Sequence, residues 1–200
     1  MADLSGKTVA VLATDGFEQV ELTEPMKALK EAGATVEIVA PKGGQIQGFN
    51  HFDKGDMFRV DRTLEEADAG RYDALLMPGG AHNPDQLRVE RAATDFVRAF
   101  FDAGKPVAAI CHAPWVLIDA GVAEGRRLTS YKTIRTDLRN AGAEVVDEEV
   151  VVDQGLVTSR GPDDLPAFCA RMVEEFAEGA HPGRERDRDA GAAADVSSIH

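Results

Sequence analysis

Apolar residues occur in this chain as short continuous runs that alternate with stretches of helical periodicity. Residues 8–13 form the first run, which is typical of a strand buried on both faces. Apolar residues then recur at helical spacing, at Leu22, Met26 and Leu29, before a glycine ends the predicted helix. Residues 35–40 form a second apolar run. This order predicts a β-α-β unit and therefore a parallel sheet.

The alternation continues towards the C-terminus. Apolar runs at 72–77 and 107–110 predict two more core strands, and residues 89–103 predict a helix between them, with its apolar side chains on one face. Shorter segments of both kinds complete the pattern. The further expected strands are 45–48, 57–60, 127–130, 144–146, 150–152 and 156–159, and the further expected helices are 133–140 and a final one capped by Asp163 or Asp164.

Residues 179–200 differ from the rest, because they combine proline, glycine, charged residues and an alanine-rich end without apolar periodicity. We therefore expect one α/β domain, residues 1–178, followed by a polar C-terminal tail, residues 179–200. A chain of 200 residues is long enough for one such domain with a full core.

Composition narrows the class of protein. A net charge of −13 argues against a nucleic-acid-binding surface. No apolar stretch approaches the roughly 20 residues of a membrane span, and the N-terminus has no signal-peptide pattern. Two cysteines provide no disulfide framework. The expectation is a cytoplasmic protein with free thiols and with neither a nucleic-acid nor a membrane partner.

The most informative segment surrounds Cys111. The strand 107–110 precedes it, an expected helix begins near Trp115, and the small residues Ala109 and Ala113 stand two positions on either side. A sharp strand-to-helix turn requires small groups there, as in the nucleophile elbow. The elbow places the side chain at the carboxyl edge of the sheet and at a helix N-terminus, which favours an anion. We therefore expect Cys111 to be a reactive thiolate; the alternative is a cysteine that serves as a small buried hydrophobe.

Two other strand ends are expected to converge with Cys111 on one crevice at the carboxyl edge of the sheet. One carries Glu18, which either shares a proton with the sulfur or caps the following helix. Glu21 and Glu24 fit the capping role better. The other carries Gly79 and Gly80, whose amides, with the amide of His112, are expected to form an oxyanion hole.

No histidine lies between residues 113 and 180, so a base near Cys111 is expected to be His112, Glu18 or a group borrowed from elsewhere. The His112 ring is adjacent to Cys111 in sequence, so the two side chains tend to diverge, and the alternative is a ring that lines the pocket. Asp85 either orients this histidine or caps a helix in a polar loop. Tyr131 is expected to face the crevice, and Cys169 to pack in the last helix.

The sequence offers no cofactor or metal site. No cluster of His, Cys and Asp residues has metal-ligand spacing, and no glycine-rich nucleotide-binding loop is present.

Several separate motifs resemble the ThiJ/PfpI family of intracellular proteases and protein deglycases, over about residues 7–178. The matching segments are Asp15-Gly-Phe-Glu-Gln-Val-Glu-Leu22, Met77-Pro-Gly-Gly80, Asn83-Pro-Asp85, Ala109-Ile-Cys-His-Ala-Pro114, Leu117-Ile-Asp-Ala-Gly-Val122, Leu128-Thr-Ser-Tyr131, Asp137-Leu-Arg-Asn-Ala-Gly142, Glu149-Val-Val-Val-Asp153 and Thr158-Ser-Arg160.

The resemblance implies a flavodoxin-like three-layer sandwich, with a mostly parallel central sheet between helices. It also implies Cys111 as nucleophile, Glu18 as its hydrogen-bonded carboxyl partner and His112 as the second catalytic residue. It implies a homodimer or higher homo-oligomer in which an acid from the neighbouring subunit orients the histidine. Asp85 stands at that position, where family members carry the longer Glu.

The family also implies the activity. We expect a stress-response enzyme whose Cys111 thiolate attacks reactive dicarbonyls or glycated proteins, because a thiolate adds readily to an aldehyde. One alternative is an intracellular cysteine peptidase that uses Cys111, His112 and the neighbour's acid. The other is a redox-sensing or chaperone-like stress protein without turnover, in which Cys111 is oxidised.

Overall fold

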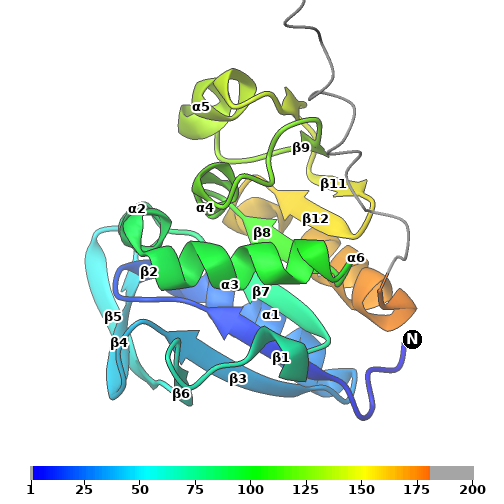
Figure 1. Ribbon diagram of the computed structural model, residues 1–200. Coiled ribbons are helices and arrows are strands. Elements are labelled where there is room, and N and C mark those ends of the chain that lie inside the picture. The colour runs from blue at the N-terminus through cyan, green and yellow to red at the C-terminus, as the bar shows by residue number, and fades with distance from the viewer. Residues whose placement is uncertain (1, 181–200) are drawn as a thin grey trace, which may run out of the picture.

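A seven-stranded sheet forms the centre of the computed structural model, which describes residues 2–180 (Figure 1). All its neighbouring strands are parallel except the pair β11–β12. Their order across the sheet is β11 (Val150–Asp153), β12 (Leu156–Ser159), β8 (Val107–Ile110), β7 (Ala74–Met77), β1 (Thr8–Leu12), β3 (Thr35–Ala40) and β6 (Arg62–Thr63).

Helices cover both faces of this sheet. On one face α1 (Gln19–Glu31) packs beside α6 (Leu165–Glu178), and on the other lie α2 (His82–Val89), α3 (Arg91–Asp102), α4 (Pro114–Asp119) and α5 (Arg135–Asn140) (Figure 1). Strand β1 shows how the sequence produces this arrangement. Val9 and Val11 join the core beneath α1 and α6, whereas Ala10 and Leu12 join the core beneath α3 and α4. The expected three-layer α/β sandwich is confirmed.

Smaller elements surround the sheet. An antiparallel hairpin of β4 (Gln45–Asn50) and β5 (Asp53–Arg59) adds β2 (Phe17–Glu18) along one edge. The parallel pair β9 (Arg127–Leu128) and β10 (Glu144–Val145) lies beyond α4. Residues 2–180 also contain three single turns: η1 (Ala69–Arg71), η2 (Lys132–Ile134) and η3 (Pro162–Asp164).

The segment after β7 differs from the sequence expectation. The sequence predicts a polar loop around Asp85, but this residue lies in the first turn of α2, where Pro84 is tolerated because its missing N–H needs no partner there. The expected helix 89–103 begins instead at Arg91, because Glu90 is extended and separates α2 from α3.

The last helix also starts differently. Asp164 precedes α6 but makes no side-chain cap bond. Its carboxylate instead accepts hydrogen bonds from the backbone N–H and guanidinium of Arg160.

The division into a domain and a polar tail stays a prediction, since residues 181–200 lie outside the described part of the chain. Within residues 2–180, no helix has the length and apolar character needed to cross a membrane.

Candidate active site

Cys111 occupies the sharp turn between β8 and α4. Its φ of +64° is a left-handed conformation, which is strained for a residue with a side chain. The Cys111 N–H donates to Ser159 O at 3.0 Å, and the Ala113 N–H donates to Ile110 O at 3.0 Å. Ala109 and Ala113 are both buried, as the elbow requires. The Cys111 side chain is 6% exposed, so only a narrow opening reaches it.

The carboxyl group beside the sulfur belongs to Glu21. This residue is fully buried in the first turn of α1, and its side chain is hydrogen-bonded to Cys111. Glu21 Oε2 accepts the Gly79 N–H at 2.9 Å, whereas Oε1 meets no nitrogen or oxygen partner among residues 2–180. Burial raises the pKa of Glu21 to about 8, and the charge of Glu18 acts in the same direction. Both effects favour the protonated form of Glu21.

The expected hydrogen bond between Glu18 and the sulfur is wrong. Glu18 Oε2 instead accepts the His51 N–H at 3.1 Å, and the side chain lines a separate hollow of about 610 Å³ beside the β4–β5 hairpin. The backbone gives the reason. Glu18 is extended and ends β2, so it points towards the hairpin, whereas Glu21 lies about one helical turn later on the inward face of α1.

A sequence signal for Glu21 was available. The buried positions of α1 are 21, 22, 25 and 29, so Glu21 stands in the apolar stripe of the helix. A carboxylate in such a stripe is shielded from water, which is unfavourable. A functional or structural partner must therefore offset the lost hydration. Acidic residues in the first turn of a helix are usually caps, and this general preference favoured the capping role for Glu21.

The amides of the two glycines after β7 both contact Glu21. The Gly79 N–H donates to Glu21 Oε2, so it is not free for an oxyanion. The Gly80 amide is hydrogen-bonded to Glu21 and to Cys111, and the His112 amide is hydrogen-bonded to Cys111. A Cβ on Gly79 would lie 2.6 Å from Cys111 Cβ, so only glycine permits this approach. The predicted oxyanion hole is thus reduced from three amides to those of Gly80 and His112.

The surroundings of Cys111 disfavour the ionised thiolate that the sequence suggests. Burial raises the pKa of the thiol far above its ordinary value, and the charge of Glu21 acts in the same direction. The Gly80 and His112 amides oppose this shift but do not reverse it. The helix expected to stabilise the anion, α4, is only 6 residues long and begins three positions later. The thiol therefore needs a base.

His112 is placed to be that base. Its Nδ1 lies 3.1 Å from Cys111 Sγ, so the adjacent side chains converge rather than diverge. Its Nε2 lies 3.2 Å from Thr133 Oγ1, and its ring stacks on Tyr131 with centroids 4.7 Å apart. Burial lowers the pKa of His112, which keeps the ring neutral. The tautomer with hydrogen on Nε2 donates to Thr133 and leaves Nδ1 free to accept the thiol proton.

The remaining predicted residues lie outside this group. Asp85 is exposed on α2, where its carboxylate meets the neighbouring Gln86 amide at 3.4 Å. Within residues 2–180 of this one chain it makes no contact with His112. Cys169 is half-buried against the core in α6, and burial raises its pKa to about 11. The described residues contain no cluster of His, Cys, Asp and Glu able to hold a metal ion.

An elbow cysteine flanked by a buried carboxyl and a histidine agrees with the comparison to known families, in which the family model described as "DJ-1/PfpI family" matches residues 7–175. The chain belongs to the DJ-1/PfpI family. The protein is an enzyme of the PfpI type.

Two curated relatives illustrate the range of the family. General stress protein 18 of Bacillus subtilis is 47% identical over 165 residues, which cover 82% of this chain and 94% of the relative. Protein/nucleic acid deglycase 2 of Escherichia coli is also 47% identical over 165 residues, which cover 81% of this chain and 93% of the relative.

Solved structures give the same result. The crystal structure of Drosophila melanogaster DJ-1beta matches with a TM-score of 0.78 and 31% sequence identity, covering 86% of this chain and 90% of that one. The likeness extends over most of the DJ-1beta chain, so the two proteins share this fold.

Proposed function

We propose that the protein is a cysteine-dependent stress enzyme that converts reactive dicarbonyls, and the adducts they form on proteins, into hydroxy acids. The observation that carries this proposal is the placement of one sulfur between two proton carriers. Glu21 is a buried acid that holds its proton, and His112 is a neutral base 3.1 Å from the sulfur. Reactions that move protons between neighbouring carbons need an acid and a base together.

The first step on methylglyoxal forms a hemithioacetal. His112 Nδ1 takes the thiol proton as the sulfur attacks the aldehyde carbon, and the new S–C bond displaces the carbonyl electron pair onto oxygen. The Gly80 and His112 amides hold that oxygen, which then receives the proton from His112.

The second step moves hydrogen within the bound substrate. His112 removes the proton from the former aldehyde carbon while Glu21 protonates the neighbouring carbonyl oxygen, which gives an enediol. His112 then returns its proton to the neighbouring carbon while Glu21 takes the proton of the hydroxyl on the former aldehyde carbon, which gives a thioester of lactate. One carbon is oxidised and the other is reduced, so no external oxidant is needed. Water then breaks the S–C bond and releases lactate and the thiol. On a protein adduct the amine is the additional product.

Peptide hydrolysis is the second candidate function, and one observation favours it. The objection that His112 is too close in sequence to serve the sulfur fails, since the two atoms lie 3.1 Å apart. A Cys–His pair at this distance suits acyl transfer. Amide hydrolysis must also protonate a poor leaving group, whereas addition of the sulfur to an aldehyde expels none, which supports the dicarbonyl reaction over peptidase chemistry.

A role as a redox sensor without turnover receives less support. Peroxide reacts with the thiolate, and burial raises the pKa of Cys111. A sensor cysteine is usually more exposed than the 6% found here.

We further propose a homodimer or higher homo-oligomer located in the cytoplasm, in which Asp85 of one subunit orients His112 of the next. Asp85 is exposed and its carboxylate has no cation beside it within residues 2–180 of its own chain, so it is available to a second copy.

Lactate formation from methylglyoxal tests the proposal, with cleavage of a fluorogenic peptide measured in parallel. We expect the wild-type protein to form lactate, Cys111→Ser to form none, and the control Cys169→Ser to match the wild type. Peptide cleavage that depends on Cys111 in the absence of lactate formation would overturn the order of the two candidates.

A further inference from the structure

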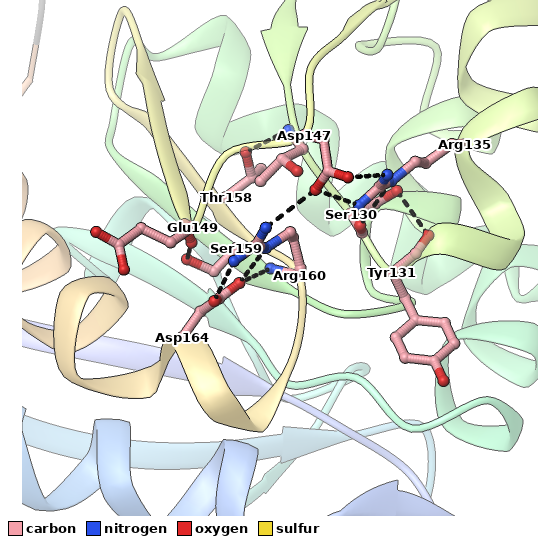
Figure 2. Close-up of polar contacts among 10 residues, drawn as sticks. Ser130, Tyr131, Arg135, Asp147, Glu149, Thr158, Ser159, Arg160 and Asp164 are labelled. Carbon is pink, nitrogen blue, oxygen red and sulfur yellow. Dashed lines mark hydrogen bonds and ion pairs between the residues drawn. The ribbon is translucent and has the colours of Figure 1, made fainter.

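One exposed carboxylate, that of Asp147, joins the loop after β10, the first residue of α5 and the loop after β12 at the carboxyl edge of the sheet (Figure 2). Asp147, in the loop after β10, accepts two hydrogen bonds from Arg135 at 2.8 and 2.7 Å, and a third from Arg160 at 3.0 Å. Bidentate arginine–carboxylate pairs have the most restrictive geometry among ion pairs. These hydrogen bonds lower the pKa of Asp147 to about 2, so the carboxylate stays charged at every physiological pH.

Arg160 is held on its other side as well. Its Nε and Nη2 donate to the two oxygens of Asp164 at 2.8 Å each, and its backbone N–H donates to the same carboxylate at 2.9 Å. The two arginines and two aspartates therefore alternate in charge. Without Asp147, two guanidinium groups would face each other with no anion between them.

This network of Arg135, Asp147, Arg160 and Asp164 is connected to the active site through the segment 130–135. Arg135 Nε donates to Ser130 O at 3.4 Å, and the Tyr131 N–H donates to Cys111 O at 2.8 Å. Two neighbours of the His112 ring lie on this segment, namely the Tyr131 ring on its face and Thr133 Oγ1 at Nε2. The orientation of His112 towards the sulfur thus depends on where this segment lies.

The segment is anchored on one side only. The buried Ile134 packs in the core and the Tyr131 N–H is bonded to Cys111 O. On the other side a hollow of about 280 Å³ is lined by Tyr131, Arg135, Asp147 and Arg160 among others. Because this space is open, the side chains of Tyr131 and Arg135 can shift into it without a clash once the ion pairs are removed.

We propose that Asp147 is a positioning residue that fixes His112 against Cys111 through Arg135 and the segment 130–135. This inference rests on the proposed function, because it assigns His112 the role of base. Asp147 is 61% exposed, and exposed ion pairs contribute little stability. A displacement of about 1 Å at a reacting group, in contrast, costs about 100-fold in rate. Loss of Asp147 therefore changes the rate more than the fold.

Three variants test the inference. Asp147→Asn keeps the shape and removes the charge, Asp147→Glu keeps the charge, and Asp163→Ala removes a different carboxylate that lines the same hollow. We expect Asp147→Asn to lower kcat for methylglyoxal by about tenfold or more with little change in KM or Tm. Asp147→Glu should recover at least half of the wild-type kcat, and Asp163→Ala should match the wild type.

A second measurement separates this inference from the proposed function. The rate at which iodoacetamide alkylates Cys111, with Cys169 as internal reference, depends on the base but not on the substrate. We expect Asp147→Asn to slow alkylation of Cys111 alone. If the wild type forms no lactate, the proposed function fails, while alkylation still decides the role of Asp147. A wild-type kcat or alkylation rate in Asp147→Asn, or a loss in proportion to Tm, overturns the inference.

Discussion

A carboxyl group in the interior with no cation beside it destabilises a protein whenever it ionises, and Glu21 is such a group. Its side chain is fully buried, and one of its oxygens lacks a partner among the described residues. The free-energy cost has a definite sign. The folded-state pKa of Glu21, about 8, lies above the ordinary value of 4.5. The contribution of Glu21 to the free energy of unfolding is therefore greatest below pH 4.5 and falls as the pH rises towards 8.

Replacement of Glu21 by glutamine should remove this dependence. The amide oxygen still accepts the Gly79 N–H, and the amide group carries no charge at any pH. We expect Glu21→Gln to resemble the wild type in urea unfolding at pH 4.5 and to be more stable than the wild type at pH 8. Its lactate formation should be lost, because an amide transfers no proton. An equal difference in stability at the two pH values would contradict the assignment of the raised pKa to Glu21.

At the scale of elements, the loop between β7 and α2 is the most constrained connection in the site. Gly80 has a φ of +77°, and a Cβ there would lie 2.5 Å from Gly16 O and 2.7 Å from Glu18 N. Both contacts are to backbone, which cannot move aside as a side chain does. The loop therefore links β7, β2 and the elbow into one rigid edge.

Alanine at Gly80 should destabilise the protein more than alanine at a glycine that shares only the backbone strain. Gly125 provides this comparison, because its φ is +71° and nothing lies within 4 Å of the position that a Cβ would occupy. We expect Gly125→Ala to cost about 1 kcal/mol in chemical denaturation. Gly80→Ala should cost at least about 2 kcal/mol and abolish lactate formation, since overlap adds to strain. Equal losses for the two variants would show that the close approach is unimportant.

The elements themselves could largely be predicted from the sequence, for a physical reason. Strands such as β1 and β8 lie between two layers of helices, so their apolar runs are nearly continuous and their ends are clear. The break between α2 and α3 could not be predicted in this way. It depends on the extended backbone of Glu90, and a single polar residue leaves no mark on the apolar periodicity.

The residues of the site also differ in how far the sequence predicts them. Cys111 was predictable, because the elbow imposes small residues at fixed positions around it. The sequence alone does not decide between Glu18 and Glu21, because the choice depends on the residue at which the short β2 ends and α1 begins. The reach of His112 also depends on the left-handed backbone of Cys111, which turns adjacent side chains towards each other.

At the scale of the whole molecule, the proposal makes the active site a property of two subunits. Cys111, His112 and Glu21 come from one chain, and Asp85, exposed on α2, is available to a neighbour. In a symmetric dimer such an exchange occurs twice, once at each site.

Mixing two inactive variants tests this arrangement. Cys111→Ser lacks the nucleophile and Asp85→Ala lacks the shared acid, and each should have low activity alone. After subunit exchange in equal amounts, half of the dimers are mixed and one site of each is intact, so about a quarter of full activity should return. A mixture of Cys111→Ser with Cys111→Ala is the control and should stay inactive. Failure to recover activity despite proven exchange would place Asp85 outside the neighbour's site.

The central claim is that the Cys111 sulfur forms the covalent bond to the substrate. The most direct measurement is acid quenching during turnover of methylglyoxal, followed by mass spectrometry of the peptides. The account predicts a lactoyl group on the peptide that contains Cys111, none on the peptide that contains Cys169, and accumulation of neither in Cys111→Ser. Lactate formation by Cys111→Ser, or turnover by the wild type with the Cys111 peptide unmodified throughout, would contradict it.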